Sequence, residues 1–326
     1  MTDHARRRWM LVLRLLVSAA VIAFIVTRVD LDQFEHLLPT MRWHLVLAAL
    51  AGLLAERYVV SYRWELLLVA KRIRIPFGGL VKVYFLSGFL GTFLPSSIAP
   101  DFVRVWVASR NGAKSHDVLS SVIIDRVIGL YSLLLMALFA LLALTVAPNP
   151  TLKLNVPWQA LAVLAALALG AALYPFPPLR RSSSGRGGLA ARLWEHFLKF
   201  YESCESYKSR RGTLLSVLLI SLVNQSLAVL VIWFVARSLG AELSLVYLFL
   251  IVPVVSVLVM IPISLGGLGV QEGAYAYLFT LAGLDTQLSI AIALLFRALT
   301  LLSTLPGAWF YSTGSYREQM GAAPRE

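Results

Sequence analysis

The segment Leu94-Pro95-Ser96-Ser97-Ile98-Ala99-Pro100-Asp101 breaks the apolar region 77–109 near its middle. The apolar region 245–284 is broken in the same way by Ile261-Pro262-Ile263-Ser264-Leu265-Gly266-Gly267. Both breaks contain the pattern Pro-x-Ser-aliphatic-small. A helix that ends at membrane depth leaves backbone N–H and C=O groups unpaired, and these are tolerated only beside a polar cavity or a ligand. Two such breaks in the two halves of a chain predict an inverted repeat of the transporter type; two proline-kinked hairpins packed for shape are the alternative.

The composition excludes soluble, disordered and fibrous classes of protein. Of the 326 residues, 59% are hydrophobic and 14% are charged, and the mean hydropathy is +0.77. Soluble domains have about 45–50% apolar and about 25% charged residues. We therefore predict an all-α, polytopic membrane bundle. A full crossing needs about 20 apolar residues, and the sequence contains six such spans: 9–29, 43–69, 118–147, 158–175, 213–238 and 287–311.

The net charge of +12 is concentrated in some of the loops. Basic residues follow the second span, precede the third and fill the 176–212 connection, whereas the 30–42 loop is acidic. Because basic loops stay in the cytoplasm, both termini are expected there, in an inner (cytoplasmic) membrane. The tails would be residues 1–8 and 312–326, around one integral membrane domain over 9–311.

This topology requires each broken region to enter and leave the membrane on one side. Region 77–109 would then open to the cytoplasm and region 245–284 to the outside. Within the 176–212 connection, a flexible basic linker precedes apolar residues at three-to-four-residue spacing, which predicts an amphipathic helix on the cytoplasmic leaflet. A helix that binds a partner is the alternative. Cys204 is the one cysteine, so no internal disulfide can form, and no metal site or cofactor is expected.

Ionisable residues at membrane depth are expensive and usually face a bundle interior or a cavity. Asp101 and Arg104 are three residues apart, so they can pair on one helix face. Asp125 and Arg126 are adjacent and point in different directions, so we expect them to have different partners. The other members of this set are Glu56, Arg57, Arg63, Glu272 and Arg297.

Arginine outnumbers acidic residues in this deep set, and its planar fork suits phosphate or carboxylate. Helix N-termini at the breaks would add partial positive charge. The glycines of the second break would let backbone approach a ligand or another helix. We therefore predict a cavity for an anionic headgroup, with structural ion pairs as the alternative. Its candidate residues are Arg63, Ser96, Ser97, Asp101, Arg104, Asp125, Arg126, Gly266, Gly267, Gly269, Glu272 and Arg297.

Two blocks of the sequence resemble a known family. They are Pro95, Asp101 and Arg104 followed by Asp125-Arg126-Val127-Ile128-Gly129, and Pro262-x-Ser-x-Gly-Gly-x-Gly-x-x-Glu272 with Arg297. Both resemble the flippase-like membrane domain of lysylphosphatidylglycerol synthases, also called the UPF0104 group, which includes the membrane half of the multiple peptide resistance factor. The resemblance covers roughly residues 10–311 and implies a stand-alone member without the synthase domain. The Ser96-Ser97 break departs from the glycine-rich first break of that family.

The resemblance and the charges together favour a lipid flippase that moves an anionic phospholipid or polyprenyl-phosphate lipid. Membrane lipids would be its partners, with no role for nucleic acid, and the chain would not be an enzyme. One alternative is a non-transporting accessory subunit of a lipid-modifying enzyme. Another is a polyprenyl-dependent glycosyltransferase that uses Asp30 and Asp32 of the first external loop. An aminoacyl-lipid synthase is disfavoured because only a short tail follows the last span.

Overall fold

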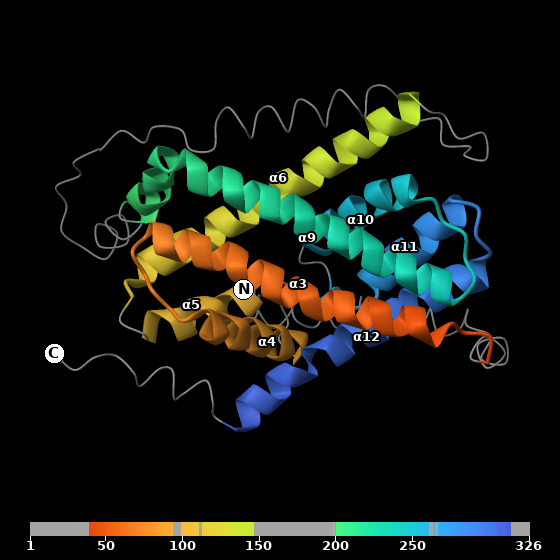
Figure 1. Ribbon diagram of the computed structural model, residues 1–326, viewed down its shortest axis with the longest axis horizontal. Helices are drawn as coiled ribbons and strands as arrows, with labels where there is room; N and C mark the ends of the chain where they lie inside the picture. The colour runs from red at the N-terminus through yellow and green to blue at the C-terminus, as the bar shows by residue number, and fades with distance from the viewer. Residues whose placement is uncertain are drawn as a thin grey trace, which may run out of the picture.

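The computed structural model describes residues 39–93, 99–110, 113–146, 198, 200–260, 264 and 267–313, and every regular element in those ranges is helical. Four helices have the length and hydropathy to cross a membrane, so the chain is a polytopic helical membrane protein. They run side by side along the long axis of the bundle (Figure 1): α3 (Trp43–Ala70), α6 (Ser115–Val146), α9 (Arg211–Ser238) and α12 (Thr286–Ser312). The expected spans 9–29 and 158–175 lie outside the described residues, so six crossings stay a prediction.

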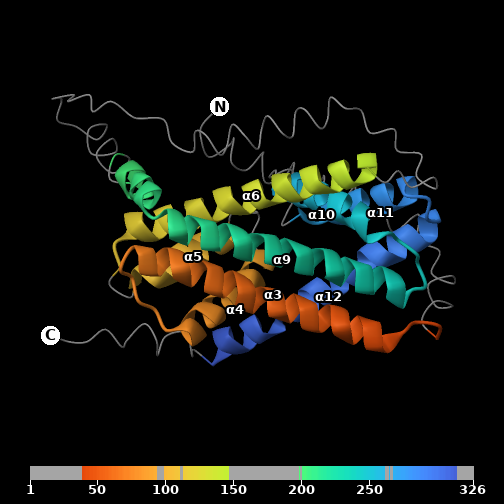
Figure 2. The ribbon, with the colours of Figure 1, turned by 45° about the horizontal axis from the view of Figure 1, so that its top comes forward.

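Each broken region forms two short helices packed on each other. The first pair is α4 (Phe77–Phe93) and α5 (Ala99–Arg110), and the second is α10 (Leu245–Met260) and α11 (Val270–Leu281). The two pairs lie toward opposite ends of the bundle (Figure 2). In the second break, Gly267 and Gly269 have φ of +77° and +82°. L side chains rarely adopt this conformation, so the turn into α11 needs glycine at both positions.

Contacts between helix ends show the direction of α3 relative to α9 and α6. At one end of the bundle, the Arg42 N–H at the start of α3 donates to the Ser238 carbonyl at the end of α9, at 2.9 Å. At the other end, Lys71 Nζ, just after α3, lies 3.4 Å from Asp117 in the first turn of α6. Helix α3 is therefore antiparallel to both α9 and α6.

The helices repeat in order and length. Helices α3 to α6 have 28, 17, 12 and 32 residues, and α9 to α12 have 28, 16, 12 and 27. Helix α3 packs on α9, α4 packs on α12 and α10 packs on α6. Each short pair therefore contacts the last long helix of the other half, which is the arrangement that an inverted repeat produces.

The described end of the 176–212 connection is anchored to the bundle. Lys71 Nζ donates to the Ser203 carbonyl, the Ser203 hydroxyl and the Ser206 hydroxyl at 2.6, 2.5 and 2.7 Å. The Tyr207 hydroxyl donates to the Leu67 carbonyl at 2.8 Å, and burial lowers the pKa of Lys71. Cys204 and Tyr207 belong to a core cluster with α3, α4 and α6. The apolar side of the described residues therefore packs on the bundle, and the position of this helix on the cytoplasmic leaflet stays a prediction.

The same anchoring predicts an unreactive cysteine. Cys204 is fully buried, and burial raises the pKa of its thiol to about 11. The thiolate is the reactive form, so Cys204 should resist charged thiol reagents at pH 7 in membrane vesicles. Mass spectrometry should find it labelled only after denaturation. Rapid labelling of the native protein would contradict the described packing.

A second prediction concerns the crossing of α12 and α4. A Cβ at Gly307 would overlap the backbone carbonyl of Phe85, whereas a Cβ at Gly78 on α4 would meet nothing within 4 Å. Overpacking at such a contact costs about 1–3 kcal/mol. Gly307→Ala should therefore lower the thermal stability of the purified protein in detergent, and the matched control Gly78→Ala should not. Equal thermal unfolding midpoints for the two variants would contradict the close contact between α12 and α4.

Candidate functional site

The charged residues of the first half gather around the start of α5. Asp101 is the third residue of that helix, directly after Pro100, and Arg104 follows one turn later. The Arg104 NH1 lies 3.2 Å from the Asp101 Oδ1, so the pairing expected from their spacing is confirmed. Both side chains are buried.

Asp125 of α6 lies between two arginines from other helices. Its Oδ1 is 2.6 Å from the Arg63 Nε of α3, and its Oδ2 is 3.2 Å from the Arg104 NH2 of α5. The Tyr84 hydroxyl of α4 donates to the same Oδ2 at 3.5 Å. With 2% of its surface exposed, Asp125 ties four helices together through one carboxylate.

Aromatic and hydroxyl groups complete the surroundings of the two buried arginines. The Arg104 guanidinium lies 4.4 Å from the centroids of both the Trp64 and the Tyr84 rings. Such cation–π contacts are strongest where water is excluded. The Arg63 NH1 donates to the Ser221 hydroxyl of α9 at 3.1 Å, which extends the network across the bundle.

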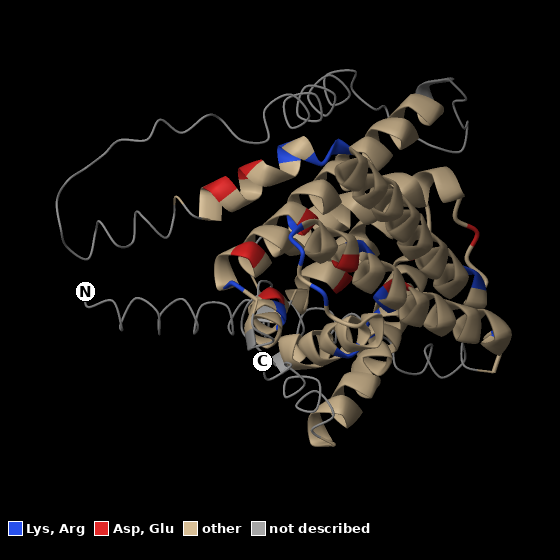
Figure 3. Ribbon diagram, turned by 60° about the vertical axis from the view of Figure 1, so that its left-hand side comes forward, with Lys and Arg blue, Asp and Glu red and all other residues tan. Residues whose placement is uncertain are grey.

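Arg126 has a different position from its neighbour Asp125. Its Nε donates to the Asp101 carboxylate, so the expectation of different partners for the adjacent pair is confirmed. Its side chain is 35% exposed, whereas those of Asp125 and Arg104 are nearly inaccessible. Three arginines and two aspartates leave this cluster with one net positive charge when all are ionised. Figure 3 shows such charged positions inside an otherwise uncharged bundle.

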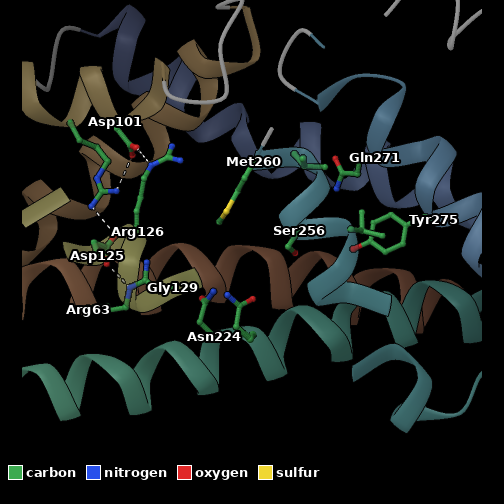
Figure 4. A pocket seen from close by; sticks show the side chains of 14 residues that line it. Arg63, Asp101, Asp125, Arg126, Gly129, Asn224, Ser256, Met260, Gln271 and Tyr275 are labelled. Carbon is green, nitrogen blue, oxygen red and sulfur yellow. Dashed lines mark hydrogen bonds and ion pairs between the residues drawn. The ribbon is translucent and has the colours of Figure 1, made fainter. Parts of the chain in front are cut away.

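A cavity of about 390 Å³ opens beside this cluster, and we call it the first cavity. The charged residues lie on one side of it, and Ser256, Gln271 and Tyr275 lie on the other (Figure 4). Its walls come from α3, α5, α6, α9, α10 and α11, with the lining residues Arg63, Asp101, Arg104, Asp125, Arg126, Gly129, Asn224, Gln225, Val255, Ser256, Val259, Met260, Gln271 and Tyr275.

The second half carries its own ion pair. The Arg297 Nε of α12 lies 3.1 Å from the Glu272 Oε1, and its NH1 donates to the Gln271 Oε1 at 3.0 Å. The Glu272 Oε2 accepts from the Gly269 N–H at 2.7 Å. Glu272 therefore both caps the start of α11 and neutralises an intramembrane arginine.

The predicted site residues fall into three groups. Arg63, Asp101, Arg104, Asp125 and Arg126 line the first cavity together. Gly267 and Gly269 lie at the second break, Glu272 lies on α11 and Arg297 lies on α12, and none of them lines that cavity. Ser96, Ser97 and Gly266 lie outside the described residues.

Several polar residues of the cavity wall were absent from the predicted set. They are Asn224, Gln225, Ser256, Gln271 and Tyr275. The adjacent amides of Asn224 and Gln225 interrupt an otherwise apolar span, and that signal could have identified them, because polar side chains at this depth are uncommon. The buried Oδ1 of Asn224 accepts no hydrogen bond from the described residues.

The coordination of Asp125 predicts a large loss of stability when its charge is removed. Asp125→Asn leaves Arg63 and Arg104 without their shared counter-ion, and breaking a buried pair costs about 3–5 kcal/mol. The matched control is Glu242→Gln, because Glu242 is 84% exposed where it pairs with Arg237, and such pairs contribute about 0–1 kcal/mol. Thermal unfolding in detergent measures both variants. An unchanged midpoint for Asp125→Asn would contradict the structural importance of the cluster.

Comparison with known proteins agrees with this architecture. A UPF0104 membrane protein of Pyrococcus horikoshii is 23% identical over 261 residues, which cover 74% of this chain and 78% of the relative. The family model described as the lysylphosphatidylglycerol synthase TM region matches residues 11–307. That match spans most of the sequence, including both broken regions and both ion-paired clusters. The chain therefore belongs to the family of the lysylphosphatidylglycerol synthase TM region.

Proposed function

We propose that this protein moves an anionic lipid across the cytoplasmic membrane by accepting its headgroup in the first cavity. The observation that carries the proposal is the arginine-rich cluster at membrane depth. It joins three guanidiniums to two carboxylates beside a cavity of about 390 Å³.

The net charge of the cluster matches a singly charged phosphodiester. Asp101 and Asp125 neutralise two of the three arginine charges. The negative charge of a phosphate group beside Arg126 would neutralise the third. Arginine binds phosphate through two parallel N–H donors, and such charged hydrogen bonds are stronger than neutral ones. The Arg126 side chain is the most accessible of the three guanidiniums, which favours it as the direct contact.

The remaining walls suit the other parts of a lipid headgroup. Asn224, Gln225 and Gln271 offer amide donors and acceptors, and Val255 and Met260 offer apolar surface. The volume of the first cavity lies near the lower end of the ~300–1,000 Å³ range of small-molecule pockets. A cavity of this size fits a headgroup while the acyl chains stay in the bilayer.

The family match supports a lipid role. The matched family is the membrane region of an enzyme that makes a charged lipid, and no catalytic domain is part of the match. A membrane region of this kind would handle the lipid and leave the transfer chemistry to another domain or protein. We therefore propose transport, with membrane lipids as the partners and both termini in the cytoplasm.

Reconstitution in liposomes tests this function. Wild-type protein in vesicles with fluorescent phosphatidylglycerol should speed its exchange between leaflets, read by quenching with dithionite. Arg126→Ala should slow this exchange about tenfold or more, because a charged hydrogen bond contributes about 1.5–3 kcal/mol. Arg237→Ala is the matched control, since Arg237 pairs with the exposed Glu242 at the end of α9.

Two other outcomes of this assay would contradict parts of the proposal. Exchange no faster than in empty vesicles would reject transport and favour the accessory role. Exchange that Arg126→Ala leaves at the wild-type rate, with equal reconstitution, would keep transport but remove the first cavity from the pathway.

A further inference from the structure

Glu56 is an acidic residue in the middle of α3, a helix long and apolar enough to cross a membrane. No ion pair or hydrogen bond joins its carboxyl group to any residue that the structure describes. Its electrostatic contacts are with Arg57, the next residue, and with Tyr275 of α11. Ionisable residues at this depth are costly and usually mark a functional site. Ion pairing within the described bundle does not account for this carboxyl group.

Glu56 lies on the face of α3 that packs on α9. One turn before it, a Cβ at Gly52 would overlap Val231 of α9. Two turns after it, the Arg63 NH1 donates to the Ser221 hydroxyl of α9, and Arg63 lines the first cavity. Residues four and seven apart share one face of a helix. The Glu56 face of α3 is therefore the face that leads along α9 to the first cavity.

Glu56 lies at the same level of the bundle as the polar wall of this cavity. Where the antiparallel helices α3 and α9 meet, the Arg42 N–H donates to the Ser238 carbonyl. Glu56 and Asn224 each lie fourteen residues from this junction, hence at one level. Asn224 and Tyr275 both line the first cavity (Figure 4), and Glu56 does not. The Glu56 charge therefore acts on Tyr275 in the cavity wall without facing the cavity itself.

The other half of the bundle has a neutral residue at the equivalent position. The two halves share a register, because their acid–arginine pairs join the third residue of a short helix to the twelfth residue of a long one: Asp101–Arg126 and Glu272–Arg297. The fourteenth residue is Glu56 in α3 and Asn224 in α9. An uncharged amide occupies this position in one half, so the helix packing does not require a carboxylate in the other.

Helices α4, α6, α9 and α12 pack on α3, and their ionisable groups have other positions or partners. Tyr84 of α4 donates to Asp125 of α6. Arg297 of α12 pairs with Glu272 and, together with Arg57, lines a smaller cavity of about 240 Å³. The others are Arg126 of α6, which pairs with Asp101, and Arg211 and Arg237 near the ends of α9.

We propose that Glu56 binds a proton when an anionic headgroup occupies the first cavity, so that the protein moves the lipid anion and a proton together. This proposal rests on the proposed function. An ionised Glu56 and a phosphate beside Tyr275 would be like charges, and like charges repel strongly in a low-dielectric interior. A proton on the carboxyl group removes this repulsion. Because such coupling is reciprocal, binding of the phosphate promotes uptake of the proton.

The proton balance of the cycle is simple. The carboxylate of Glu56 forms an O–H bond with a proton from water as the headgroup enters, and this bond breaks to return the proton to water as the headgroup leaves. A phosphodiester and a proton together carry no net charge, which lowers the cost of moving the headgroup through the bundle. A difference in pH across the membrane would then set the direction of lipid movement.

Proton uptake on lipid binding tests the proposal with purified protein. Short-chain phosphatidylglycerol, added to the wild type in weakly buffered detergent at neutral and mildly alkaline pH, should raise the pH that a dye reports. Isothermal titration measures the binding itself. Glu56→Gln keeps the size of the side chain without its ionisable group, so this variant should bind the lipid and take up no proton. The matched control Glu242→Gln, at a side chain that is 84% exposed, should behave as the wild type.

Two results of this titration would overturn the proposal. One is lipid binding to the wild type without proton uptake at any pH tested. The other is equal uptake by Glu56→Gln and the wild type, which would assign the proton to another group.

The direction of transport gives a second readout, which uses the wild type and so does not depend on how the variant folds. In vesicles with a pH gradient, fluorescent phosphatidylglycerol should accumulate in the leaflet that faces the alkaline side, relative to protein-free vesicles. Glu56→Gln should exchange the lipid between leaflets but distribute it as it does without a gradient. A wild type that ignores the gradient would overturn the coupling and keep the proposed function, whereas no exchange at all would reject the proposed function.

Discussion

The carboxylate of Asp125 is the group on which the charged interior depends. It pairs with Arg63 and Arg104 from two other helices. A buried charge without a counter-ion is very costly in a low-dielectric interior, so neither arginine could remain at that depth alone. Because Arg104 also contacts Asp101, which in turn pairs with Arg126, the charged side of the first cavity is one connected network that includes Asp125.

The start of each broken pair's second helix also places a carboxylate beside an arginine. A half-helix such as α5 or α11 brings its unpaired N-terminal N–H groups to the middle of the bundle, where a carboxylate can satisfy them. Glu272 does this with the Gly269 N–H and still pairs with Arg297. The same carboxylate therefore stabilises a helix end and holds an arginine next to a cavity.

The sequence could predict the contacts of this site within one helix but not its contacts between helices. Helical spacing is enough to pair Asp101 with Arg104, and adjacency is enough to separate Asp125 from Arg126, because both depend on a single helix. Nothing in the chain indicates that Arg63 reaches Asp125, since that contact depends on how α3 packs against α6. For a related reason, the periodicity of the helix that contains Cys204 marks an apolar face but does not show whether lipid or protein covers that face.

Comparison of the two repeats separates positions that share their chemistry from positions that have diverged. The sixth residue of α5 is Arg104 and that of α11 is Tyr275; the eleventh residue of α6 is Asp125 and that of α12 is Phe296. The ion pair of the first half is thus replaced by an edge-to-face contact of the Tyr275 and Phe296 rings, whose centroids are 5.5 Å apart. A buried ionic network can be exchanged for apolar packing at little cost, so these positions hold helices together in either chemistry. The acid–arginine pairs at the third and twelfth positions remain charged in both halves although the packing around them has changed. Glu272 also accepts from the Gly269 N–H at the start of α11, so the retained pair of the second half has a structural role of its own.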